Sequence, residues 1–234
     1  MIKLLESISI FPVLLTLAAF RVGQLCQQKW KKPIFNPTLI GMILVIAFLL
    51  ATGMNADGYT AEMGKMSWLM TPATICLAIP MYEQFQILQK SLKAILAGVC
   101  AGTLSCMLVI AAVGLLLEFE QSILISLLPK SVTTAIGVSL SELFGGMGGV
   151  TTAVIIVTGI AGNMMGPMLC KLFGITDEVA QGVAFGTAAH VIGTAKANEL
   201  SQLTGAASSL SLVVAGLLTA VFMPLIVNLL EKGV

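Results

Sequence analysis

The sequence predicts an all-α membrane protein of about eight spans, with interrupted helices and internal repeats. Two observations predict this fold class: the composition, and an alternation of long and short uncharged segments along the chain. Of the 234 residues, 57% are hydrophobic and only 10% are charged. Soluble domains carry about 25% charged residues, so lipid is the expected solvent for most of this chain.

The composition also excludes several classes of function. The 12 basic and 11 acidic residues leave no basic surface for nucleic acid. The five cysteines form no CxxC pair and there is one histidine, so we expect no metal site and no cofactor. The sequence contains no Ser-His-Asp arrangement, catalytic carboxylate pair or HExxH motif, so enzyme activity is not expected.

A helix that crosses the hydrocarbon layer needs about 20 largely apolar residues. Four long segments carry no charge and are the strong span candidates: 33–56, 94–117, 143–170 and 200–230. Four weaker candidates are shorter or are interrupted by a polar residue: 7–20, 66–82, 121–141 and 179–195. Strong and weak segments alternate, and eight crossings are expected if every segment spans the membrane.

The positive-inside rule gives an orientation if all eight segments cross. One side would carry Arg21, Lys29, Lys31, Lys32, Lys90 and Lys93, and the other Lys3, Lys65, Lys171 and Lys232. The first side is expected to be cytoplasmic, with both termini outside. The assignment depends mainly on the basic cluster at 29–32.

The alternation has a period. The pairs Ile79-Pro80, Ile136-Gly137 and Ile192-Gly193 lie in weak segments at spacings of 57 and 56 residues. This favours a repeated unit of one interrupted helix and one full helix, an arrangement found in many secondary carriers. The alternative is a chance agreement among small residues in an apolar sequence.

Prolines mark the first interrupted segment. Pro72 and Pro80 each remove a backbone donor, so a helix here is expected to break or kink. Thr71 then either repairs the lost hydrogen bonds or lines a wet cavity.

The segment 121–141 contains a candidate anion site. Lysine at mid-membrane costs about 2.5 to 3.5 kcal/mol, and Pro129 favours a half-helix that starts at this point. Such a helix start would present free amides, the Lys130 ammonium and hydroxyls to an anion. The hydroxyl residues are Ser131, Thr133 and Thr134. The alternative places Lys130 near an interface, with its ammonium among the lipid headgroups.

The segment 186–199 is the most polar stretch of apparent membrane depth. Thr187, His190 and Thr194 share one helix face, and Lys196 and Glu199 are i,i+3 neighbours. The unperturbed pKa of histidine, near 6.5, makes His190 a candidate proton carrier. The alternative is a histidine that hydrogen-bonds a neighbouring helix. Glu142 lies just before the strong segment 143–170, as Glu199 lies just before 200–230. Both glutamates are assigned to proton coupling.

Four segments carry a resemblance to a known family. They are 72–84, which contains AIPMYEQ; 128–134, which reads LPKSVTT; 158–167; and 186–196, which reads GTAAHVIGTAK. Over nearly its whole length the chain resembles the LrgB/CidB family of bacterial inner-membrane proteins, the YohK-type proteins among them. Ala135, Ala189 and Lys196 stand where the family usually has Pro, Ser and Arg.

The resemblance implies two functions. Family members resemble antiholin-like regulators of murein-hydrolase export that work with a small LrgA/CidA-type membrane partner. A plastid relative is regarded as a glycolate and glycerate carrier, and bacterial relatives are linked to pyruvate or similar acids.

We therefore expect one LrgB-like membrane domain over 1–234, a homo-oligomer in the bacterial inner membrane, that carries small monocarboxylates with protons. The expected substrate-binding residues are Lys130, Ser131, Thr133, Thr134, Thr187, Thr194 and Lys196. The alternative is the antiholin- or holin-like regulator. Polar residues that converge on a pocket within one protomer would favour the carrier, and a multi-chain polar interface would favour the regulator.

Overall fold

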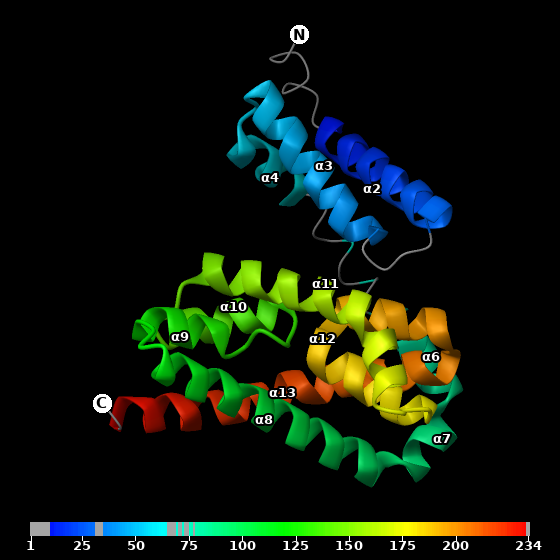
Figure 1. The fold of residues 1–234 in the computed structure, drawn as a ribbon, viewed down its shortest axis with the longest axis vertical. Helices are drawn as coiled ribbons and strands as arrows, with labels where there is room; N and C mark the ends of the chain where they lie inside the picture. Colours follow the sequence, from blue (N-terminus) through cyan, green and yellow to red (C-terminus); the bar gives the residue numbers. More distant parts are fainter. Residues whose placement is uncertain are drawn as a thin grey trace. The chain divides into compact units, whose positions relative to one another are not determined.

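The computed structural model describes residues 10–30, 35–64, 69, 72, 75–76 and 78–232. Every regular element in these ranges is a helix, which confirms the all-α class. The chain divides into two compact units, Met1–Cys76 and Leu77–Val234 (Figure 1). The prediction that residues 1–234 form one domain stays a prediction.

The described part of the first unit includes the helices α2 (Phe11–Trp30), α3 (Pro37–Thr52) and α4 (Ala56–Gly64). The Asn36 side chain starts α3 by accepting hydrogen bonds from the amides of Thr38 and Leu39, at 2.9 and 3.2 Å. α3 has 16 residues, fewer than the roughly 20 of a straight crossing. α2 runs through Arg21, beyond the predicted segment 7–20.

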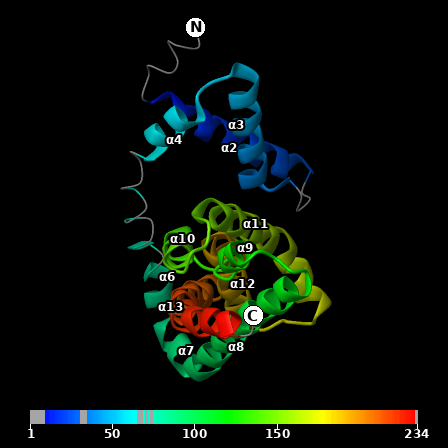
Figure 2. The ribbon, with the colours of Figure 1, turned by 90° about the vertical axis from the view of Figure 1, so that its left-hand side faces the viewer.

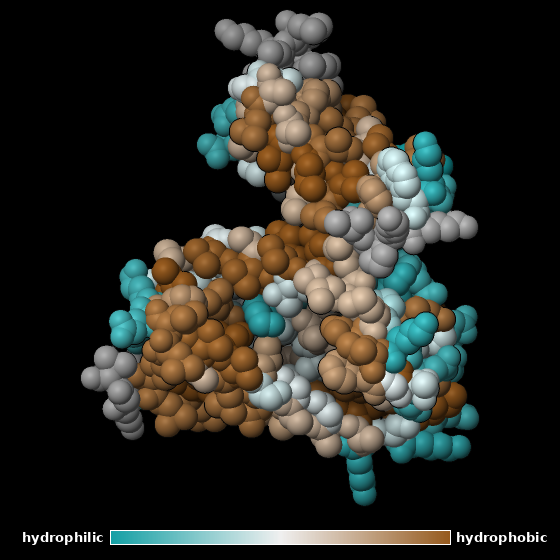
Figure 3. Space-filling view, viewed as in Figure 1, coloured by the Kyte–Doolittle hydropathy of each residue, from teal (hydrophilic) through white to brown (hydrophobic). Residues whose placement is uncertain are grey.

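Three long apolar helices form the frame of the second unit: α8 (Leu92–Leu116), α11 (Gly148–Leu172) and α13 (Gln202–Lys232). These three are long and apolar enough to cross a membrane, among the residues that the structure describes. Leu108, Val157 and Leu217 are exposed on them. Figure 3 shows a broad hydrophobic surface over this unit, with hydrophilic groups gathered towards its two ends. The predicted number of about eight spans is not confirmed.

Between α8 and α11 the chain turns back on itself. α9 (Gln121–Leu127) and α10 (Thr134–Leu143) pack together and are joined by a turn at 128–133; we call the segment 121–143 hairpin 1. Thr151 of α11 bonds both Ser126 and Ser141, which brings the two helices alongside each other. With 7 and 10 residues, the helices are only about 10 and 15 Å long. Hairpin 1 therefore enters and leaves the bundle at the same end.

A second hairpin lies between α11 and α13. α12 (Glu178–Leu200) is broken at Ala189 and His190, where φ/ψ are −130°/15° and 42°/−137°. A Cβ at Gly193 would lie 2.7 Å from the carbonyl oxygen of Phe185, whereas residues eight apart in a straight helix are about 12 Å apart. The second half of α12 therefore folds back onto the first, and we call 178–200 hairpin 2.

The two hairpins enter from opposite ends of the bundle. One buried cluster joins Leu124 of hairpin 1 to Ala111 and Ile226, in the C-terminal parts of α8 and α13. Another joins the N-terminal parts of α8 and α13 around Ile95, and Val183 of hairpin 2 packs on it. α8 and α13 are thus parallel, and they lie side by side in Figure 2. The turns of both hairpins lie towards the middle of the bundle (Figure 1).

The predicted alternation of interrupted and full helices is observed twice. Hairpin 1 precedes α11, and hairpin 2 precedes α13. The segments 121–141 and 179–195, which were counted among eight crossings, fold back instead. Two short helices, α6 (Ala78–Glu83) and α7 (Phe85–Lys90), precede α8, and Pro80 is the third residue of α6. Pro72 is a described, exposed residue, whereas Thr71 lies outside the described residues.

The predicted start of a half-helix at Pro129 is wrong. Pro129 is buried within the turn, and its carbonyl oxygen accepts a hydrogen bond from the Val132 amide at 3.4 Å. Thr133 is extended, with φ −64° and ψ 147°, and α10 begins at Thr134. The helix therefore breaks where expected, but the new helix starts only after the chain has reversed.

The hairpins change the predicted placement of Lys171. Because hairpin 1 returns to its own end, α11 runs antiparallel to α8. Lys171, in the last turn of α11, then lies at the same end as Lys93, in the first turn of α8. The expectation that these two lysines face opposite sides is corrected, because it assumed that 121–141 crosses.

This arrangement predicts the result of sided labelling. Single cysteines at Lys171 and Lys93, in a background without native cysteines, should react with an impermeant maleimide from the same side of the membrane. A cysteine at Glu120, at the other end of the bundle, should react from the opposite side. Labelling of positions 171 and 120 from one side would contradict the folded-back hairpin 1.

Candidate functional site

A small cavity lies in the second unit where the hairpin turns approach the middle of α8 and α13. Its volume is about 10 Å³, close to the space of one water molecule. It is lined by α8 (Thr103, Cys106 and Met107), hairpin 1 (Leu128, Ser131 and Val132), hairpin 2 (Thr187) and α13 (Ala215 and Thr219). Two predicted site residues, Ser131 and Thr187, therefore meet at one cavity within one protomer.

Hairpin 1 brings a positive charge to the rim of this cavity. The Lys130 ammonium donates a hydrogen bond to the Ser131 hydroxyl at 3.2 Å, and the Cys106 thiol lies 3.6 Å from that hydroxyl. Lys130 is partly buried, and no ion pair is found for it among the described residues. The ammonium also lies within electrostatic range of the His190 ring. The cavity is thus adjacent to a cation with no carboxylate partner in the described chain.

Two hydroxyls at the cavity lack hydrogen-bond partners. The side chains of Thr103 and Thr187 are 6% and 7% exposed, and neither Oγ1 atom is bonded to any group of the described residues. An unsatisfied buried hydroxyl costs about 1 to 3 kcal/mol. Thr219 differs, since its hydroxyl donates to the Ala215 carbonyl at 2.7 Å.

His190 lies at the break of α12 and is 4% exposed. Its Nε2 atom lies 3.0 Å from the Ile155 carbonyl oxygen. Because a carbonyl can only accept, Nε2 carries the proton of this hydrogen bond. The ring packs on α11 at Gly159, where a Cβ would come within 2.7 Å of it. His190 therefore hydrogen-bonds a neighbouring helix, as the alternative prediction stated. Its imidazole also lies within electrostatic range of Lys130.

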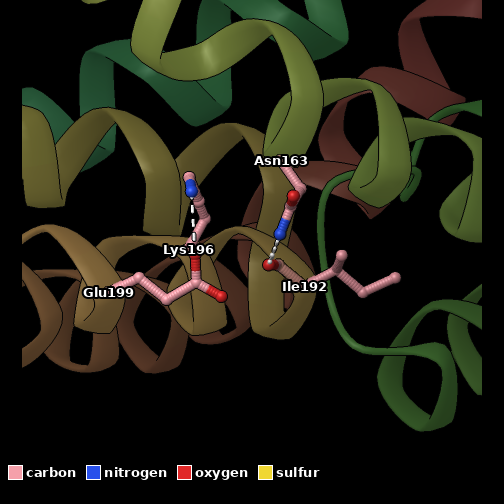
Figure 4. Close-up of polar contacts among 4 residues, drawn as sticks. All are labelled: Asn163, Ile192, Lys196 and Glu199. Atoms are coloured by element: carbon pink, nitrogen blue, oxygen red, sulfur yellow. Dashed lines mark hydrogen bonds and ion pairs between the residues drawn. The ribbon is translucent and has the colours of Figure 1, made fainter. Parts of the chain in front are cut away.

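Side chains satisfy the carbonyl groups beside the break. The Thr194 hydroxyl donates to the His190 carbonyl at 2.9 Å and also lies 2.9 Å from the Ser208 hydroxyl. The Asn163 amide of α11 donates to the Ile192 carbonyl at 3.0 Å (Figure 4). Such partners are needed because irregular backbone at membrane depth has no water to bond.

The predicted pair of Lys196 and Glu199 forms a salt bridge of 2.7 Å (Figure 4). Their side chains are 24% and 61% exposed, so the pair is open to its surroundings. Neither residue is among those that line the cavity.

The other predicted residues lie around hairpin 1. Thr133 is the N-cap residue of α10, and its side chain makes no capping hydrogen bond. Thr134 is exposed in the first turn of α10, and Glu142 is exposed near the C-terminal end of that helix, away from the turn. The structure groups Ser131 and Thr187 at the cavity with Lys130 beside them, and it leaves Thr133, Thr134 and Glu142 out of the lining.

The prediction from sequence missed Thr103, Cys106 and Thr219. All three lie in strong apolar segments, for which length and lack of charge predict only a membrane span. A hydroxyl in such a segment usually bonds its own helix, as that of Thr219 does. For Thr219 alone a signal was present in the spacing, because its distance of 112 residues from Met107 lies within one residue of the 113 that separate Ile79 from Ile192.

Comparison with known proteins identifies relatives over nearly the whole chain. The model of the LrgB-like family matches residues 16–229. Holin-like protein CidB of Staphylococcus epidermidis is 30% identical over 94% of this chain and 96% of its own length. The uncharacterized protein YwbG of Bacillus subtilis is 32% identical over 94% of this chain and 98% of its own length. No solved structure matches. The chain belongs to the LrgB-like family.

Proposed function

We propose that this protein is a secondary carrier of small monocarboxylates of the pyruvate, lactate and glycolate class, in the inner membrane of a bacterium. The observation that carries the proposal is the cavity within one protomer, where two hairpins from opposite ends meet two long helices. Polar groups at membrane depth that face a cavity mark substrate pathways.

The groups at the cavity suit a small anion. Lys130 supplies the positive charge and Ser131 a hydroxyl, both at the turn of hairpin 1. The first-turn amides of α10 lack intrahelical partners and lie at the same turn, at the positive end of the helix dipole. A carboxylate accepts hydrogen bonds from all three kinds of donor, and its negative charge matches the positive charge of the ammonium.

Transport requires the hairpins to move. A cavity of about 10 Å³ holds one water molecule and no three-carbon acid. Hairpin 1 opens towards one end of the bundle and hairpin 2 towards the other, so withdrawal of one at a time gives access from alternate sides. The buried clusters at the two ends would separate in turn.

His190 is the proposed proton carrier. It lies at the turn of hairpin 2, near Lys130 of hairpin 1. A proton on the imidazole would repel the ammonium and attract the carboxylate, which couples protonation to substrate binding. Glu199 and Glu142 stay secondary candidates, because Glu199 is already paired and Glu142 lies away from the cavity.

A second candidate function is holin-like pore control, and the names of the CidB relatives favour it over the carrier. That function would depend on an oligomer of this chain and on a small LrgA/CidA-type partner. Its polar residues would line an interface between chains.

One experiment separates the two functions. Purified protein in liposomes is tested for uptake of labelled pyruvate, lactate, glycolate and glycerate under an imposed pH gradient, and in parallel for release of a trapped dye. A carrier gives saturable uptake without dye release. Dye release without saturable uptake would support the pore.

Replacement of Lys130 tests the anion site. Lys130→Gln should raise the substrate concentration for half-maximal uptake at least tenfold, equal to about 1.4 kcal/mol, because it removes the cation beside the cavity. Lys171→Gln, at an exposed position in the last turn of α11, is the matched control and should leave this concentration unchanged. Unaltered affinity in a normally inserted Lys130→Gln protein would refute the anion site.

Replacement of His190 tests proton coupling. His190→Gln retains an N–H donor for the Ile155 carbonyl and should therefore fold, but it cannot titrate near neutral pH. Uptake by this variant should lose most of the pH dependence that the unmodified protein shows, because the titrating imidazole is removed. The measurement is the initial rate of uptake at a series of pH values. A profile identical to that of the unmodified protein would leave His190 with its structural role alone.

A further inference from the structure

Unpaired hydroxyls are concentrated at the cavity. Three buried side-chain hydroxyls lack a hydrogen-bond partner within the described ranges: Thr103, Thr187 and Ser209. The first two line the cavity, and Ser209 does not. Two other buried threonines, Thr194 of α12 and Thr219 of α13, donate hydrogen bonds to the backbone of their own helices. Thr103 and Thr187 therefore differ from the usual behaviour of threonine in a helix.

The cavity lies where corresponding positions of the repeats meet. Ser131 and Thr187 are 56 residues apart (187 − 131), one period of the repeat. Met107 and Thr219 are 112 residues apart (219 − 107), within one residue of the two repeats that separate Ile79 from Ile192. A ligand in the cavity would thus contact both hairpins and both parallel helices.

Close packing holds Thr187 against α8. A Cβ at Gly102 would lie 2.9 Å from the Thr187 methyl group. Glycine at this position lets hairpin 2 approach α8 one residue away from Thr103. The two unpaired hydroxyls consequently line the cavity from different elements, α8 and hairpin 2.

We propose that Thr103 and Thr187 bind the transported acid directly, by donating hydrogen bonds to its carboxylate. This inference rests on the proposed carrier function, gives Thr187, one of the expected substrate-binding residues, a contact with the carboxylate, and adds Thr103 of α8 as a second binding residue. Lys130 attracts the anion at the rim, and the two threonines hold it between α8 and hairpin 2. A carboxylate has enough lone pairs to accept from all three groups at once.

The test uses valine, which has the shape of threonine without the hydroxyl. Binding is measured in detergent as the rise in unfolding temperature with increasing pyruvate, lactate, glycolate or glycerate, and transport is measured in liposomes. Thr103→Val and Thr187→Val should each weaken binding at least about tenfold, since a hydrogen bond to a charged group is lost. Without ligand, their unfolding temperature should stay equal or rise by about 2 to 4 °C, because an unsatisfied hydroxyl is removed.

Ser209→Ala is the matched control, because it removes the third unpaired hydroxyl, which lies outside the cavity lining. It should keep the affinity of the unmodified protein. If both valine variants also keep that affinity, a single water satisfies the two hydroxyls and the inference is overturned. Weaker binding together with a lowered unfolding temperature would indicate a packing defect and would overturn it as well.

The two proposals can fail separately. A protein that binds an acid but transports none would remove the carrier function, and the valine variants would still decide the role of the threonines. If none of the four acids raises the unfolding temperature of the unmodified protein, the assignment of Thr103 and Thr187 to an acid site is refuted.

Discussion

The structure of the second unit depends on one constraint. The chain reverses direction twice inside an apolar bundle, and the backbone groups at each reversal must still form hydrogen bonds. The lipid around the bundle offers no partner to replace a lost hydrogen bond. At hairpin 2 the carbonyl groups of His190 and Ile192 accept bonds from Thr194 and Asn163, and the His190 ring bonds the Ile155 carbonyl. At hairpin 1 the Lys130 amide bonds the Leu127 carbonyl within the turn. α8, α11 and α13 form the frame in which these two reversals are possible.

Both reversals bring polar groups towards the middle of the bundle, and the candidate site is the cavity where these groups meet. Two hydroxyls without a hydrogen-bond partner, those of Thr187 on hairpin 2 and Thr103 on α8, lie at the cavity where the hairpins approach α8 and α13. The relatives named holin-like share the family with this chain, and a cavity within one protomer distinguishes the carrier proposal from a pore between protomers.

Local patterns in the sequence predicted those structural features that depend on residues close together in the chain. Uncharged length identified α8, α11 and α13, proline and polar residues identified the breaks, and i,i+3 spacing identified the pair of Lys196 and Glu199. The direction of the chain after a break could not be predicted in this way, because it depends on contacts such as that of Gly193 with Phe185. For the same reason the sequence did not identify Thr103, because its hydroxyl lacks a hydrogen-bond partner only as a result of the neighbours it has on other helices.

The central claim, that the cavity of the second unit binds the substrate, can be tested at Cys106, which lies 3.6 Å from the Ser131 hydroxyl and lines the cavity. The measurement is the rate at which a small thiol reagent modifies Cys106, in a protein whose other cysteines are replaced, with and without saturating pyruvate, lactate, glycolate or glycerate. A protein that retains only Cys100, on the same helix but outside the cavity lining, is the control. The account predicts that at least one acid slows modification of Cys106 and leaves that of Cys100 unchanged, whereas equal rates at Cys106 with and without every acid would contradict it.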